Sequence, residues 1–179
     1  MITAVILVHD EVGSLAACIA SLRFAARILA IADHPSPEVD KILSDSQVEV
    51  AVHPLGDDFS AQRNFALSQV KTDWALFVDA DEVVSPGLAA EISEVVKNSR
   101  YDGYFLHRTD RMWGHEFRHG DLSDVYLLRL ARPLAGKWTG RVHETWQIAG
   151  PVTRLKGALI HTPHPSVVDF LNSINHYSS

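Results

Sequence analysis

Three acidic residues, Asp79, Asp81 and Glu82, stand directly after the apolar run 74–78, which predicts a buried strand. Ligands of open α/β sheets collect at the carboxyl ends of the strands, and the spacing lets Asp79 and Asp81 point toward one volume. Carboxylates this close repel one another unless a cation lies among them, and hard oxygen ligands suit Mg²⁺ or Mn²⁺ shared with substrate phosphates. The pattern predicts a divalent-metal site; the alternative is an acidic surface turn.

Other polar residues could join this chemistry. Arg63 lies on a helix predicted to begin at Ser60, where an arginine can clamp a diphosphate or simply face solvent. His143, Glu144 and His161 stand in or beside apolar stretches. A lone histidine in such a place is more often a hydrogen-bonded structural residue than a metal ligand. Beside an acidic metal site, however, these residues become candidates for a catalytic base and for a further metal or phosphate contact.

Two other enzyme motifs match parts of the chain. Residues 115–119 spell HExxH, the zinc-peptidase motif, which requires both imidazoles on one face of a continuous helix. Gly114 and Gly120 bracket it closely, so a coincidental match is favoured. Residues 77–84 also fit the acidic motif of haloacid-dehalogenase phosphatases, but no later apolar strand ends in the acidic pair that this class needs.

Strands and helices alternate over the first hundred residues. Apolar runs predict strands at 2–8, 27–32, 48–52 and 74–78, and helical spacing or capping residues predict helices at 15–22, from Ser60 to Gln69 and from Pro86 onward. The two prolines within 34–38 predict no regular structure there. This alternation indicates a mostly parallel central sheet with helices on both faces.

The second half of the chain does not continue this regular alternation. Strands are predicted at 101–109, 124–130 and 157–161, separated by long loops, and a final helix is predicted near Ser166. No linker separates these elements from the first half. We therefore expect one α/β domain over 1–179, with a loop-rich C-terminal half.

Composition excludes several classes of protein. The chain has 179 residues, 46% of them hydrophobic, with 22 acidic and 16 basic residues and a net charge of −6. It is too apolar to be disordered, and it lacks the basic face of a nucleic-acid-binding protein. One cysteine excludes a disulfide framework and a cysteine-rich zinc site. The longest apolar stretch, 15–32, contains two arginines, so we expect a soluble cytoplasmic protein without a signal peptide.

The motifs and their order resemble a known family. Asp10-Glu11 after the first strand, Phe-Ser-x-Gln-Arg-Asn at 59–64 and Asp-Trp-x-Leu-Phe-Val-Asp-Ala-Asp-Glu at 73–82 are similar to family-2 glycosyltransferases with the GT-A fold. Later motifs resemble the branch that contains bacterial lipopolysaccharide-core β-glucosyltransferases; they lie at 118–120, 128–130, 140–144 and 159–161. The likeness covers nearly the whole chain.

The resemblance implies a nucleotide-diphospho-sugar donor bound by the first half, 1–100. Asp10 and Glu11 would flank the nucleoside. Asp33 matches the family's nucleobase-contacting aspartate with an offset of one residue, and Arg63 would lie near the nucleobase or the diphosphate. Asp79, the first Asp of the acidic DxD motif, would face the ribose or the metal.

The resemblance also implies a metal and a catalytic base. Asp79, Asp81 and His161 match positions that would bind Mg²⁺ or Mn²⁺. Glu144 matches the base best, with Asp124 as the second candidate, so 101–179 would be the acceptor and catalytic half. Because relatives often continue past this chain's C-terminal region, a C-terminal helix is expected to be missing.

The implied reaction is an inverting transfer to a saccharide or glycolipid hydroxyl in lipopolysaccharide or envelope-polysaccharide synthesis. A lipid-linked acceptor would bring the protein to the inner face of the plasma membrane as a peripheral protein. The alternatives are an idle nucleotide-sugar-binding domain, a metal-dependent phosphatase and a zinc peptidase.

Overall fold

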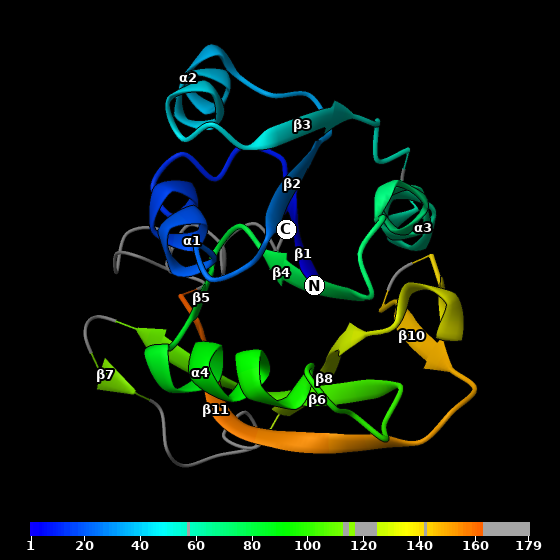
Figure 1. Ribbon diagram of the computed structural model, residues 1–179. Coiled ribbons are helices and arrows are strands. Elements are labelled where there is room, and N and C mark those ends of the chain that lie inside the picture. Colours follow the sequence, from blue (N-terminus) through cyan, green and yellow to red (C-terminus); the bar gives the residue numbers. More distant parts are fainter. Residues whose placement is uncertain (57, 113–114, 117–124, 142, 163–179) are drawn as a thin grey trace, which may run out of the picture.

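The computed structural model describes residues 1–56, 58–112, 115–116, 125–141 and 143–162 (Figure 1). Its elements in chain order are β1 (Ile2–Val8), α1 (Leu15–Ser21), β2 (Arg27–Ala32), α2 (Pro37–Asp45), β3 (Glu49–Val52), α3 (Phe59–Gln69), β4 (Trp74–Asp79), β5 (Glu82–Val84), α4 (Pro86–Val95), β6 (Gly103–Met112), β7 (His115–Glu116), β8 (Val125–Ala131), the short 3-10 helix η1 (Pro133–Ala135), β9 (Gly136–Thr139), β10 (Thr145–Ile148) and β11 (Val152–His161).

One large sheet organises the molecule, in the order β3-β2-β1-β4-β8-β6-β11-β5. The four strands β3, β2, β1 and β4 are parallel. β8 then runs antiparallel to both β4 and β6, β6 and β11 are parallel, and β5 is antiparallel to β11. The predicted α/β fold is confirmed. The antiparallel pairings of the sheet all involve strands from the second half, where β7 also pairs with β6.

Helices cover both faces of the sheet, as the alternation of strands and helices predicts (Figure 1). Along β4, Trp74, Leu76 and Val78 face a core shared with α1, α2 and α4. Ala75 and Phe77 face the opposite core, which contains α3 and the β9–β10 hairpin. Because side chains alternate along a strand, Asp79 follows Phe77 on the α3 side. This alternation is what directs the first acidic residue toward Arg63.

Capping residues explain where the helices begin. Ser85 accepts a hydrogen bond from the Leu88 amide and is followed by Pro86 in the first turn, which confirms the predicted start of α4. The start of α3 differs from the prediction: Asp58, rather than Ser60, caps this helix by accepting a hydrogen bond from the Ala61 amide. Within the described residues, no helix is both long and apolar enough to cross a bilayer.

The prediction that 34–38 lacks regular structure is wrong. α2 begins at Pro37, and the Ser36 hydroxyl caps it by accepting from the Val39 amide at 3.3 Å. Proline in the first turn has no amide to satisfy, and its fixed φ already suits a helix. The second proline therefore starts a helix instead of preventing one.

The second half contains more strand than predicted. β11 begins at Val152 rather than near residue 157, and β9 and β10 form a separate antiparallel hairpin. β11 also passes very close to α4, since a Cβ atom on Gly157 would lie 2.5 Å from Leu88 Cα. The predicted helix near Ser166 lies outside the described residues.

Candidate active site

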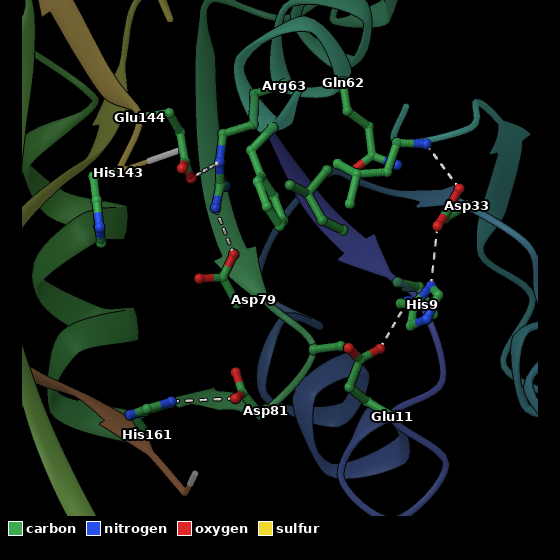
Figure 2. A pocket seen from close by; sticks show the side chains of 15 residues that line it. His9, Glu11, Asp33, Gln62, Arg63, Asp79, Asp81, His143, Glu144 and His161 are labelled. Carbon is green, nitrogen blue, oxygen red and sulfur yellow. Dashed lines mark hydrogen bonds and ion pairs between the residues drawn. The ribbon is translucent and has the colours of Figure 1, made fainter. Parts of the chain in front are cut away.

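A cavity of about 320 Å³ opens at the carboxyl ends of β1, β2 and β4 (Figure 2). The predicted site residues that line it are Glu11, Asp33, Arg63, Asp79, Asp81, Glu144 and His161, joined by His9, Gln62 and His143 among others. They come from six segments of the chain, and several meet here because parallel strands present their carboxyl ends at one edge. Asp10 is exposed and is not among the lining residues, and Asp124 lies outside the described residues.

Three consecutive residues of α3 fasten this helix to three neighbouring segments. The Gln62 side chain donates to the His53 carbonyl. Arg63 reaches the end of β4 and the β9–β10 connection. The Asn64 amide group both donates to the Trp138 carbonyl and accepts from the Trp138 amide, each at 2.9 Å. The Gln-Arg-Asn motif therefore fixes the α3 side of the cavity.

Arg63 is the central cation of the site, and only 3% of it is exposed. Its guanidinium donates to Asp79 Oδ1 at 2.8 Å and to Glu144 Oε1 at 2.7 Å. It also lies over the Trp138 ring, 4.7 Å from the centroid, and a desolvated contact of this kind contributes about 2 kcal/mol. A buried arginine needs such partners, so this one is part of the built site rather than a solvent-facing helix residue.

Asp79 is held by two arginines. Besides Arg63, Arg129 binds its carboxylate through both terminal nitrogens. Arg129 is the extra residue of a β-bulge, because Tyr104 and Phe105 of β6 pair with Leu130 and Leu128 of β8. Burial alone would raise the pKa of Asp79, but Arg129 and Arg63 outweigh it and hold the pKa well below its ordinary value. Asp79 is therefore ionised in the folded protein.

Glu82 directly follows Asp81 in the sequence and is buried, with 1% of it exposed. One carboxylate oxygen accepts from the Asp79 amide at 2.9 Å, and the other lies 3.8 Å from Arg129. Burial raises the pKa of Glu82 to about 7, against the opposing effect of Arg129 and with help from the charge of Asp79. This residue shapes the turn that carries Asp79 and Asp81.

The Asp81 carboxylate is directed toward His161 of β11 (Figure 2). His161 Nε2 lies 3.1 Å from Asp81 Oδ2, and its Nδ1 lies 2.9 Å from Asp110 Oδ1. Burial lowers the pKa of His161, but hydrogen bonds and charge from Asp81 and Asp110 outweigh this and raise it overall. A carboxylate that orients a histidine from behind is the usual support of a metal ligand.

The chemistry of this pair fits a divalent ion. Asp81 and His161 present an oxygen and a nitrogen to one point at the cavity wall, with Asp110 orienting the imidazole. Among the described residues no three carboxylate, histidine or cysteine side chains cluster as a ready metal site. Mg²⁺ commonly takes one or two protein ligands and completes its shell with phosphate oxygens and water. Asp79 as a third ligand stays a prediction, because both of its oxygens already accept from arginines.

The far end of the cavity is built around Asp33, which is 8% exposed. Its Oδ1 accepts from the Leu55 amide at 2.7 Å, and the His9 and His34 rings lie within 3.0 Å of its carboxylate. The Leu55 hydrogen bond is the main reason that the pKa of Asp33 is lowered; burial opposes it. The nearby Glu11 carboxylate accepts from the His9 amide at 2.8 Å.

Glu144 ends the loop between β9 and β10, where Gly140 and His143 both adopt positive φ angles. Its contact with Arg63 of α3 places it beside that guanidinium at the cavity wall (Figure 2). Sequence reasoning gave no role to Arg129 or Asp110. The available signal for Arg129 was a single charge inside the apolar run 125–131. The zinc-peptidase alternative for HExxH needs a helix, but His115–Glu116 forms strand β7, which agrees with the favoured interpretation of a coincidental match.

Comparison with known proteins gives these features a context. The sequence model of glycosyl transferase family 2 matches residues 3–148. A protein named uncharacterized glycosyltransferase, from Rickettsia bellii (strain RML369-C), is 30% identical over 109 residues, which is 60% of this chain and 36% of the relative. The chain thus spans about a third of the length of this curated relative.

Solved structures share the fold. S. aureus TarS 1–349 in complex with UDP superposes with a TM-score of 0.68 at 12% identity, over 96% of this chain and 62% of that one. The glucosyl-3-phosphoglycerate synthase from Mycobacterium tuberculosis, in complex with Mn²⁺, UDP and phosphoglyceric acid, gives 0.59 at 10% identity, over 98% and 75%. At such identities the likeness concerns the fold alone, which is the predicted GT-A fold.

Proposed function

The chain belongs to glycosyl transferase family 2, and on this premise we propose that it transfers a sugar from a nucleotide-diphospho-sugar to a saccharide hydroxyl, with inversion at the anomeric carbon. The observation that carries the proposal is the cavity at the carboxyl ends of β1, β2 and β4. It combines a pocket for a nucleobase near Asp33, a charged middle near Asp79 and Asp81, and the Glu144 carboxylate, of which Arg63 holds one oxygen. These are the groups that a bound donor and an attacking hydroxyl require.

The donor is proposed to lie along this cavity from Asp33 to Glu144. Asp33 and Glu11 line the end that would receive the nucleoside, while Arg63 and Asp81 line the part that would receive the diphosphate and sugar. The TarS and glucosyl-3-phosphoglycerate synthase structures were obtained with UDP, and another TarS structure with UDP-GlcNAc. These complexes support uridine diphosphate as the first nucleotide to test.

We assign the divalent ion, Mg²⁺ or Mn²⁺, to Asp81 and His161. When bound, the ion would stabilise the negative charge that builds on the departing diphosphate without needing a proton. Asp110 would keep the imidazole of His161 oriented, through the contact at its other nitrogen. Support also comes from the Mn²⁺ that accompanies UDP in the mycobacterial synthase.

Glu144 is the proposed general base. Its Oε1 is held by Arg63, and the glutamate has no other hydrogen bond within the described part of the chain. The carboxylate can therefore accept the proton of an attacking hydroxyl through Oε2, a contribution of about 10²–10⁴-fold for a well-placed base. Arg63 fixes the direction of Glu144, which is what positions a base for proton transfer.

The acceptor is proposed to be a saccharide or glycolipid of the bacterial envelope, with lipopolysaccharide core as the specific candidate. The order of motifs from 118–120 to 159–161 supports this branch of the family. A lipid-linked acceptor would place the protein at the inner face of the plasma membrane.

The proposal is tested by titrating UDP with and without Mn²⁺, and then by measuring UDP release from UDP-glucose and UDP-GlcNAc. We expect UDP binding that depends on the metal, and donor turnover that Glu144→Gln reduces by about 10²-fold or more. Metal-dependent binding without turnover of any donor, with every envelope saccharide tried as acceptor, would identify an idle binding domain instead. Absence of UDP binding would contradict the assigned donor class.

A further inference from the structure

A second cavity, of about 290 Å³, lies beside the first and beneath the β9–β10 hairpin. Its walls are mainly aromatic and aliphatic, and its polar side chains are gathered around one end. Its lining includes Phe105, Tyr126 and Leu128 on the sheet, Trp146 on the hairpin, and the polar pair Arg129 and Glu144.

Glu144 lines both cavities. Its Oε1 is bound to Arg63 on the donor side, and no described residue bonds to Oε2. A hydroxyl group that enters from the second cavity would therefore meet the carboxylate proposed to take its proton. The two cavities adjoin at Glu144, as the donor site and the acceptor site of a transferase should adjoin at the catalytic base.

Arg129 gives a second connection between the two cavities. It lines the second cavity while its guanidinium binds Asp79, which lines the first. Because a β-bulge directs this side chain, the polar end of the second cavity faces the donor. The apolar end points away from it, along β8 and β6.

The lining is rigid and suited to the face of a sugar ring. The Tyr126 ring stacks on His107, with centroids 5.0 Å apart, and Arg154 lies 4.3 Å from its centroid. Trp146 stacks on Trp138 at 5.2 Å. The negative faces and apolar bodies of such rings attract the C–H groups of a pyranose, and the polar end can meet its hydroxyl groups.

The size of the cavity favours a sugar over a lipid chain. A volume of about 290 Å³ lies just below the range that is usual for ligand sites, which is about 300–1,000 Å³. It suits a compact ring better than a long hydrocarbon chain, which would need an extended groove. An alkyl group would also leave Glu144 Oε2, to which no described residue bonds, without a partner.

We propose that this second cavity binds the acceptor as a saccharide, with one face of its terminal ring against Phe105 and its reacting hydroxyl toward Glu144. The assignment of this saccharide as the acceptor rests on the proposed function. The binding site itself can be tested without turnover, by direct binding of simple sugars.

Saturation-transfer-difference NMR provides that test, with methyl β-D-glucopyranoside and methyl α-D-mannopyranoside as probes and decanoate as an apolar contrast. Leu128→Trp fills the cavity from a half-buried position, and Phe105→Ala removes part of its aromatic wall. Leu134→Trp is the matched control, because Leu134 is fully exposed on η1 and does not line the cavity. Titration with Mn²⁺ and UDP reports separately on the donor cavity.

We expect saturation transfer to the ring protons of at least one glycoside, lost with Leu128→Trp, weakened about 3- to 10-fold in affinity with Phe105→Ala and kept with Leu134→Trp. Binding of Mn²⁺ and UDP should be unchanged in all three variants. Where Leu128→Trp fails to fold, Phe105→Ala decides the question. Glycoside signals that neither variant changes, or binding of decanoate and of no glycoside, would overturn the proposal. Glycoside binding at this cavity in a protein that binds no UDP would support the site and refute the proposed function.

Discussion

Arg63 Nε lies 2.7 Å from Glu144 Oε1, although 81 residues separate them in the sequence. The contact joins helix α3 to the loop between β9 and β10, and so links the two halves of the chain. It is supported from below by Trp138, whose ring lies under the guanidinium. A single buried arginine thus holds the proposed base and the first acidic residue in one arrangement.

Replacing Arg63 with methionine should lower the free energy of unfolding by about 3–5 kcal/mol, because Glu144 would lose its buried partner. Urea denaturation measures this change. Arg23→Met is the control, since Arg23 is exposed and donates to the Ser46 carbonyl; it should change stability by less than about 0.5 kcal/mol. Combining Arg63→Met with Glu144→Gln should cost at least about 1 kcal/mol less than the sum of the single changes. Strict additivity would show that the ion pair contributes nothing.

Asp81→Asn should abolish transfer while leaving the fold intact. Asp81 faces the cavity, and its side chain is 35% exposed, so an isosteric amide removes a hard anionic ligand at little structural cost. Mn²⁺-dependent binding of UDP and donor turnover are the measurements, with thermal melting as the check on folding. Asp40→Asn, an exposed change on α2, should alter neither. Unchanged turnover in Asp81→Asn, with metal still required, would contradict the metal assignment.

Local sequence patterns were enough to predict most of the first half of the fold. Strand β2 was predicted with the observed bounds, because a run of apolar residues between polar ones has few other interpretations. Patterns failed where a residue has two opposite meanings, as with Pro37, which can end or begin a helix. They also gave no sign that β8 would insert antiparallel between β4 and β6, because strand order depends on contacts distant in sequence.

The candidate site was predictable to the extent that strand ends determine it. Asp33, Asp79 and Asp81 follow parallel strands, and the structure brings all three to one cavity. Their individual partners were not predictable, because these depend on side-chain directions. Asp79 and Asp81 are only two residues apart, yet one is bound by Arg129 from a β-bulge and the other by His161. A bulge leaves no mark in the sequence that spacing can detect.

The raised pKa of Glu82 predicts a pH dependence of stability. Its pKa is about 7 in the folded protein and near 4.5 when unfolded, so the folded state binds the proton more tightly. This stabilisation is complete below pH 4.5 and is lost as the pH rises through about 7, on the order of 1–3 kcal/mol. Urea denaturation between pH 5 and 8 measures it.

The variant that tests this pH dependence of stability is Glu82→Gln, whose side chain cannot ionise. The variant should lose less stability than the wild type between pH 5 and 8, whatever its absolute stability. Glu94→Gln, an exposed change on α4, should follow the wild-type curve. Parallel curves for the wild type and Glu82→Gln would show that Glu82 titrates normally.

Asn64 should control the position of the hairpin that carries Glu144. Its amide makes two hydrogen bonds to the backbone of Trp138 at the base of that hairpin. Asn64→Asp keeps the shape but replaces the donor with a charge that faces a carbonyl oxygen, so we expect turnover to fall by about 10-fold or more. Binding of Mn²⁺ and UDP should stay within about twofold of the wild type, because Asp81 and His161 are untouched.

Near-ultraviolet circular dichroism gives a signal for this displacement that turnover does not. Trp138 and Trp146 stack with centroids 5.2 Å apart and an interplanar angle of 22°, so a shift of β9 should change their coupled signal. Asn64→Asp should alter this band, whereas Gln69→Asp, an exposed change at the end of the same helix, should preserve both the band and turnover. An altered band with normal turnover would show that the hairpin can move without displacing the base, and Asn64 would then be a structural residue only.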